Sequence, residues 1–141
     1  MSISKLFNKL NAPLKNVRWS WGAVDEKGRV VLRTWEKERR NINGVECVYI
    51  GGACLYKGHK DSNDQRLGAK ERLGHIELIR RGSVAGFVEC KTENLFDEKW
   101  TISSFEDKTI LLGSGLIETE QGQLFVPIRS KKTVSDFANG Q

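Results

Sequence analysis

The chain has 141 residues and a formal net charge of +5, with 38% hydrophobic and 29% charged residues. These values are ordinary for one globular domain and argue against long disordered regions. No apolar run approaches the roughly 18 residues that span a membrane, and residues 1–13 lack the apolar core of a signal peptide. We therefore expect a cytoplasmic protein with no membrane partner.

Positive charge is concentrated in the first 60 residues, where 12 Lys and Arg stand against 5 Asp and Glu, a net charge of +7. Residues 61–141 carry a net charge of −2. Basic side chains near phosphates release counterions, which favours a polyanionic partner. Nucleic acid is therefore an expected partner, and a basic surface without such a partner is the alternative.

A β-hairpin is predicted over Val17–Arg40, after a short helix over Ser4–Leu10. Its turn is Asp25–Gly28, and a loop of two or four residues pairs Val24 with Arg29. Because side chains alternate along strands, the hairpin has two distinct faces. One face is apolar enough for the core and consists of Trp19, Trp21, Ala23, Val30, Leu32 and Thr34. The other is basic and aromatic and consists of Arg18, Ser20, Gly22, Arg29, Val31, Arg33 and Trp35.

The later segments are short strands around one long helix. The helix is predicted over Asp64–Arg81, with Gly82 as its C-terminal cap. A polar loop covers Lys57–Asn63, and Leu95–Phe105 fits no single element. Strands are expected at Val45–Ile50, with Ala53–Tyr56 as its continuation, and at Val84–Lys91, Ile110–Leu112, Leu116–Glu118 and Leu124–Ile128.

These elements indicate an α+β fold. We expect a mostly antiparallel curled sheet or small barrel, with one main helix and a short N-terminal helix. Residues 1–129 form a single globular domain in this interpretation, and residues 130–141 form a frayed C-terminal tail.

The main helix carries arginines within its apolar arc, which consists of Ala69, Leu73, Ile76 and Ile79. Arg72 and Arg80 project within that arc, whereas His75 lies outside it. One interpretation places both guanidinium groups in water at the arc's edges, with their aliphatic stems over the core. The other places an arginine at a cleft, where it meets a phosphate or a base edge.

One strand ends in a candidate catalytic pair, Glu89 and Lys91. This spacing is half of the PD-(D/E)xK nuclease signature, in which carboxylates hold Mg²⁺ and the lysine assists the attacking water. An upstream acid is also needed, and Asp61 or Asp64 would have to supply it. No Pro-Asp pair precedes the strand, so the nuclease is an alternative function.

The cysteines and histidines offer two further possibilities. Irregular spacing argues against a zinc site, and no histidine is fixed beside a cysteine for nucleophilic catalysis. Apolar neighbours favour buried structural cysteines instead. The residues considered are Cys47, Cys54, His59, His75 and Cys90. We therefore expect no metal and no cofactor.

Three segments carry a family resemblance: Asn16–Val24, Val31–Trp35 and Glu71–Ile76. They resemble a group of small uncharacterised bacterial proteins. The order of elements, with tryptophans on early strands and a basic β-rich body, is similar to PUA-like folds, the EVE, ASCH and SRA modules. That resemblance implies recognition of RNA or modified DNA bases through an aromatic pocket, often in bacterial or phage defence.

The sequence thus predicts a nucleic-acid-binding module that is not an enzyme as an isolated chain. Arginines would contact phosphates, and a tryptophan would stack on an unpaired base. The predicted binding residues are Arg18, Arg33, Trp35, Lys37, Arg39, Arg40 and Arg72. A metal-dependent nuclease using Glu89 and Lys91 is one alternative. The other is a protein-interaction or inhibitor domain that uses the same Trp/Arg face, since both residue types are favoured at protein interfaces.

Overall fold

The computed structural model describes residues 1–52, 63–93 and 102–140. The predicted segments Ala53–Tyr56, nearly all of Lys57–Asn63 and the first part of Leu95–Phe105 lie outside these ranges. Within them, no helix combines the length and apolar character needed to cross a membrane. The elements are α1 (Ile3–Lys9), β1 (Gly22–Val24), β2 (Val30–Trp35), the 3₁₀ helix η1 (Glu36–Glu38), β3 (Arg40–Ile42), β4 (Val45–Gly52), α2 (Asn63–Arg80), β5 (Ala85–Lys91), β6 (Ser104–Phe105), β7 (Thr109–Gly113), β8 (Ile117–Glu118), β9 (Gln123–Thr133) and α3 (Val134–Ala138).

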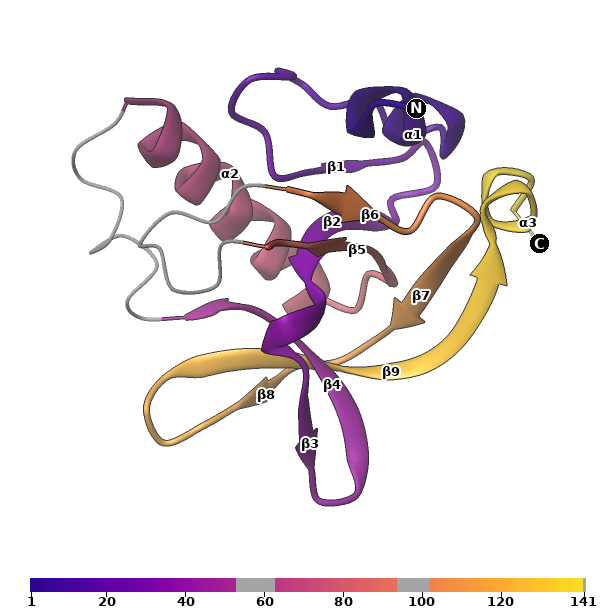
Figure 1. Ribbon diagram of the computed structural model, residues 1–141. Helices are drawn as coiled ribbons and strands as arrows, with labels where there is room; N and C mark the ends of the chain where they lie inside the picture. The colour runs from indigo at the N-terminus through magenta and orange to yellow at the C-terminus, as the bar shows by residue number, and fades with distance from the viewer. Residues whose placement is uncertain (53–62, 94–101, 141) are drawn as a thin grey trace.

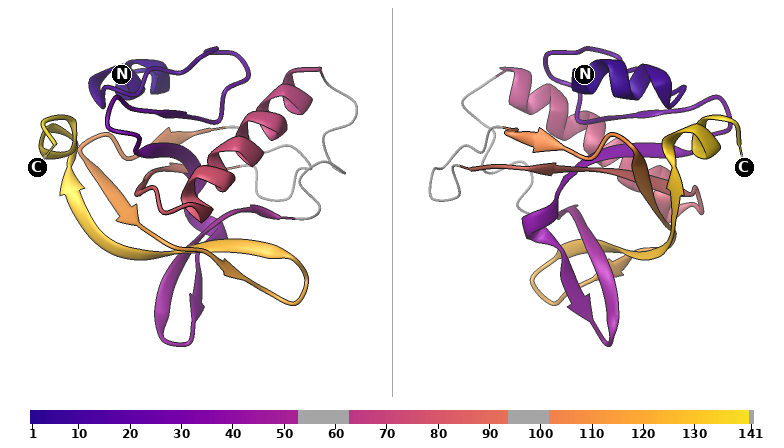
Figure 2. Two further views of the ribbon diagram at one scale, coloured as in Figure 1. Left: turned by 180° about the vertical axis from the view of Figure 1, so that it is seen from behind. Right: turned by 45° about the vertical axis from the view of Figure 1, so that its right-hand side comes forward.

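The described strands form one nine-stranded sheet in the order β1-β2-β5-β7-β9-β4-β3, with β6 beside β5 and β8 beside β9. Among the described strands, only β2 and β5 pair in parallel, because the chain between them crosses over through α2. The long strand β9 bends from β4 and β8 toward β7 (Figures 1 and 2). The prediction of an α+β fold with a curled, mostly antiparallel sheet is confirmed, and the sheet is open rather than closed into a barrel.

Two apolar clusters pack on opposite faces of the sheet, and β2 contributes to both. Val31 belongs to the cluster that contains the buried residues of α1 and α3. Val30 and Leu32 belong to the cluster that contains Ile76 and Ile79 of α2. All three β2 residues are fully buried, because β2 is flanked by β1 and β5 and covered on both sides.

The predicted hairpin forms, but its register is shifted by one residue. Val24 pairs with Val30 rather than with Arg29. The turn contains an odd number of residues, and Gly28 adopts a φ of 78°. Asp25 fixes this turn, because its carboxylate accepts hydrogen bonds from the backbone N–H groups of Lys27 at 2.9 Å and Arg29 at 2.8 Å. Each side chain of β1 therefore lies on the opposite face of the sheet, relative to the side chains of β2, from the one predicted.

The tryptophans before β1 are not in a strand, so the predicted pattern of faces is wrong there. Trp19 lies in a turn, and both Trp19 and Trp21 are half-buried rather than core residues. Ser20, Gly22 and Val31, predicted to lie on the binding face, are buried instead. The strand pattern fails because the chain turns before it reaches Gly22, where β1 begins.

Helix α2 matches the predicted range within one residue, and Gly82 follows it with a φ of 110°. Its buried face is rotated from the predicted apolar arc. Leu73 is exposed, whereas Arg72 and His75 are buried. Arg80 is exposed, as the edge interpretation predicts. The shift arises because residues 68, 72, 75 and 79 form one row along the helix, which packs toward β1 and β2.

Residues 130–140 were expected to be a frayed tail, and that prediction is wrong. Strand β9 continues to Thr133, whose hydroxyl caps α3 by accepting from the N–H of Asp136 at 3.1 Å. Val134 and Phe137, three residues apart, place apolar side chains in the core. The globular domain therefore includes α3, which Figure 1 shows beside the end of β9.

Candidate functional site

A groove of about 410 Å³ lies between η1 and the sheet. We call it the η1 groove. One wall is the segment that runs from η1 into β3, and the floor is one face of β5, β7 and β9, where Phe87, Leu111 and Lys131 are cross-strand neighbours. The lining residues are Glu36, Arg39, Phe87, Glu89, Lys91, Ser104, Phe105, Glu106, Lys108, Thr109, Leu111 and Lys131.

Two ion pairs connect the wall to β5. In one the cation lies on the wall, and in the other the cation lies on β5. Arg39 donates through Nε to Glu89 Oε2 at 2.5 Å, and its Nη2 pairs with Glu89 Oε1, so the contact is bidentate. The hydrogen bond to Glu89 raises the pKa of Arg39 against the opposing effect of burial. Lys91 Nζ lies 3.4 Å from Glu36 Oε2. Each pair therefore joins one residue of β5 to the segment around η1.

The far side of the groove has two lysines whose ammonium groups have no ion-pair partner among the described residues, Lys108 and Lys131. The Glu106 carboxylate accepts hydrogen bonds from the N–H of Lys108 at 3.2 Å and from the Thr109 hydroxyl at 3.3 Å. Among the described residues that line the groove, four side chains are cationic and three are anionic. An anion entering this groove would meet cations on both of its sides.

The predicted binding residues do not form one surface. Lys37, Arg39 and Arg40 lie in the segment that runs from η1 into β3, where Arg39 lines the η1 groove and the other two are exposed. The guanidinium of Arg40 lies 4.8 Å from the centre of the Phe125 ring. Arg18 is exposed in the segment between α1 and β1, and β1 and β3 stand at opposite ends of the strand order (Figure 1). The structure therefore does not bring Arg18 together with the other three.

Arg72 lies inside the protein and holds three chain segments together. Its Nη1 donates to the carbonyl of Ile50 at 2.9 Å, and its Nη2 donates to the carbonyls of Arg33 at 2.7 Å and Trp21 at 3.3 Å. Only 6% of its surface is exposed. Arg72 therefore lies neither at the solvent-exposed edge of the apolar arc nor at an open cleft, the two positions that the sequence suggested. Trp35 is half-buried at the end of β2.

Sequence reasoning missed a cluster of ionisable groups around Arg72. Burial lowers the pKa of Arg72 to about 10, and burial together with the Arg72 charge lowers the pKa of His75 to about 4. Burial also raises the pKa of Glu38 and Glu71, although a hydrogen bond from the Ser20 hydroxyl opposes the rise for Glu71. The signal in the sequence is the spacing of Arg72 and His75, which puts them on one helix face.

This cluster contains buried polar atoms with no hydrogen-bond partner in the described structure. Three belong to α2, the Glu71 Oε1, Arg72 Nε and His75 Nδ1 atoms, and the fourth is Thr34 Oγ1 on β2. Burial lowers the pKa of Arg33, which is half-buried near Glu71 and Cys90. The cluster is closed by packing, so the η1 groove is the more accessible candidate site.

Glu89 and Lys91 do share the η1 groove, as the nuclease hypothesis requires. The Glu89 carboxylate, however, is already held by Arg39. In residues 1–52, 63–93 and 102–140, no three His, Cys, Asp or Glu side chains are grouped so that they could hold a metal ion. Asp61 and the Asp64 side chain lie outside the described structure.

The cysteines within the described ranges, Cys47 and Cys90, are buried free thiols. Burial raises the pKa of both, to about 11 for Cys90. Protonated thiols are weak nucleophiles and weak metal ligands. Cys54 and His59, considered for the same zinc site, lie outside the described residues.

Comparisons of the chain with protein-family models, curated proteins and solved structures found no match.

Proposed function

We propose that this protein binds nucleic acid and that a single-stranded segment lies in the η1 groove. The observation that carries the proposal is the convergence of four cations on one groove from separate parts of the chain. Arg39 follows η1, Lys91 ends β5, Lys108 precedes β7 and Lys131 lies on β9. Such cations neutralise phosphates and release counterions.

The size of the groove favours a flexible strand. Its volume of about 410 Å³ is within the range typical of small-ligand sites, so it suits a nucleotide rather than the side of a duplex. Phe105 lines the groove and is half-buried, which leaves part of its ring available to a base. A reader of RNA or of a modified DNA base, as the PUA-like resemblance implies, is one form of this function.

The test is a binding titration with fluorescently labelled single- and double-stranded DNA and RNA over a series of salt concentrations. We expect affinity to fall with salt and single strands to bind best. Lys108→Ala and Lys131→Ala should each weaken binding and reduce the slope of log affinity against log salt by about 0.7. The matched controls Lys9→Ala and Lys70→Ala remove exposed lysines outside the groove and should change binding little.

Other outcomes would replace this proposal. Absence of binding to every oligonucleotide at low salt would favour the protein-interaction alternative. Cleavage of the oligonucleotide in Mg²⁺ or Mn²⁺, lost in Glu89→Gln, would instead favour the nuclease. Equal losses in the groove variants and in the two control variants would show that the groove is not the binding site.

A further inference from the structure

We infer that Glu89 occupies, in the free protein, the place on Arg39 that a phosphate of the ligand takes in the complex. The inference rests on the proposed function and adds a residue that sets its affinity. Carboxylate and phosphate both accept two parallel hydrogen bonds from one edge of a guanidinium. Glu89 uses the edge formed by Nε and Nη2 of Arg39. A phosphate that takes this edge must displace the carboxylate.

The pair is open enough to exchange partners. The Arg39 side chain is 30% exposed and the Glu89 side chain 12%, and both line the groove. Arg72 is the contrasting case, because it is buried and donates to backbone carbonyls that cannot move aside. Arg39 is therefore the guanidinium that a ligand in the groove can reach.

The displaced carboxylate does not become an isolated buried charge. Lys91 lies two residues further along β5, so its side chain is on the same face as that of Glu89. Lys91 is 66% exposed, and its contact with Glu36 is open to solvent. Exposed ion pairs of this kind contribute little to stability. Lys91 can accordingly turn toward Glu89 when a phosphate holds Arg39.

The test compares two isosteric neutralisations in the same groove. Glu89→Gln should tighten binding of a short labelled single-stranded oligonucleotide by about five- to tenfold, because Arg39 no longer has an anionic competitor. Glu36→Gln adds the same charge to the groove but releases only the exposed Lys91. We expect it to change affinity by about twofold or less. Glu89→Gln/Arg39→Ala should lose the gain.

The outcomes separate this inference from the proposed function. If wild-type protein binds no oligonucleotide, the proposed function fails. If wild-type protein binds but Glu89→Gln gains no more than Glu36→Gln, or binds more weakly than wild type, the exchange at Arg39 is wrong.

A measurement on wild-type protein removes any dependence on how the variants fold. In ¹⁵N NMR, the side-chain Nε–H signal of Arg39 should move when the oligonucleotide is added, while that of Arg72 should not. A stationary Arg39 signal during binding would also overturn the inference.

Discussion

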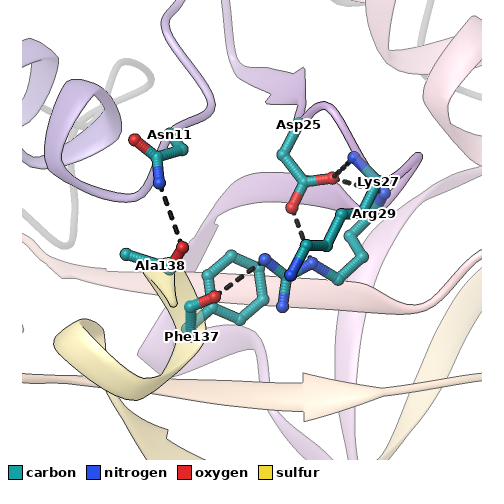
Figure 3. Close-up of polar contacts among 6 residues, drawn as sticks. All are labelled: Asn11, Asp25, Lys27, Arg29, Phe137 and Ala138. Atoms are coloured by element: carbon teal, nitrogen blue, oxygen red, sulfur yellow. Dashed lines mark hydrogen bonds and ion pairs between the residues drawn. The ribbon is translucent and has the colours of Figure 1, made fainter. Parts of the chain in front are cut away.

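The guanidinium carbon of Arg29 lies 3.7 Å from the centre of the Phe137 ring, so the turn between β1 and β2 is fastened to the last helix (Figure 3). Arg29 also donates through Nη2 to the Phe137 carbonyl at 2.8 Å and through Nε to Asp25 Oδ2 at 2.6 Å. Nearby, the Asn11 side-chain amide donates to the Ala138 carbonyl at 3.0 Å. The last described helix, α3, is thereby attached both to the turn between β1 and β2 and to the segment that follows α1.

Arg29→Ala should destabilise the protein by roughly 2–4 kcal/mol, because it leaves the buried Asp25 carboxylate without its charged partner. Chemical denaturation measures this loss. Arg81→Ala is the matched control, since Arg81 pairs with Glu77 at 3.2 Å but is 74% exposed. It should cost less than about 1 kcal/mol. Equal costs for the two variants would show that neither the pair with Asp25 nor the contact of Arg29 with α3 contributes much to stability.

Removal of residues 134–141 should unfold the protein or reduce its melting temperature severely. Val134 and Phe137 are both buried in the cluster that contains α1, and Phe137→Ala alone should cost roughly 3–5 kcal/mol. Ser135 is exposed on the same helix, so Ser135→Ala should be nearly neutral. A truncated chain that melts like the full chain would restore the interpretation of this segment as a tail.

Replacement of each of two glycines in α2 by alanine should change the stability of the protein in opposite directions. A Cβ at Gly68 would lie 2.5 Å from the Trp21 ring and 2.7 Å from the Trp19 carbonyl oxygen, so Gly68→Ala should destabilise by roughly 1–3 kcal/mol. A Cβ at Gly74 would meet no atom within 4 Å. Gly74→Ala should stabilise by up to about 1 kcal/mol through helix propensity. Thermal melts of both variants, run together, decide whether α2 packs on Trp21.

His75 should make stability fall as the pH decreases from 6.5 to about 4. Its pKa is lowered from 6.5 to about 4 by burial and by Arg72, so in this window the unfolded chain binds a proton that the folded protein excludes. The full effect is about 3 kcal/mol. Glu38 and Glu71 act in the opposite direction, because burial raises their pKa values. The measurement that isolates His75 is the free energy of unfolding as a function of pH, compared between wild type and His75→Gln. Parallel profiles would contradict a buried neutral His75.

Local patterns predicted the elements better than they predicted how the elements meet. The range of α2 followed from its periodicity and from Gly82, which are local features. The hairpin register depended on the Asp25 side chain, whose hydrogen bonds select an odd loop, and composition does not distinguish odd from even loops. Val31 is buried because α1 and α3, from the two ends of the chain, cover that face of β2.

The candidate site shows the same limit. Arg39, Glu89 and Lys91 were each identified from local sequence, but on two separate hypotheses. Parallel pairing of β2 with β5 brings Trp35 beside Cys90, and this places the segment after β2 against the end of β5. Lys108 and Lys131 reach the same groove through β7 and β9. No local pattern predicted those pairings, so the sequence did not predict these two lysines as site residues.

The parallel pair of β2 and β5 also constrains how the protein folds. Strand β2 pairs with β5 through contacts such as Val30 with Ala85, which are far apart in sequence. Arg29 likewise bonds to Phe137, near the end of the chain. Contacts so distant in sequence give a high contact order, which slows folding because a long loop must close first. During synthesis, β2 leaves the ribosome with β1 as its strand neighbour, and its other edge stays unpaired until β5 has been made. The face of β2 that carries Val31 is covered by α3 only once residues 134–138 have been made, so the nascent chain exposes apolar surface there until then.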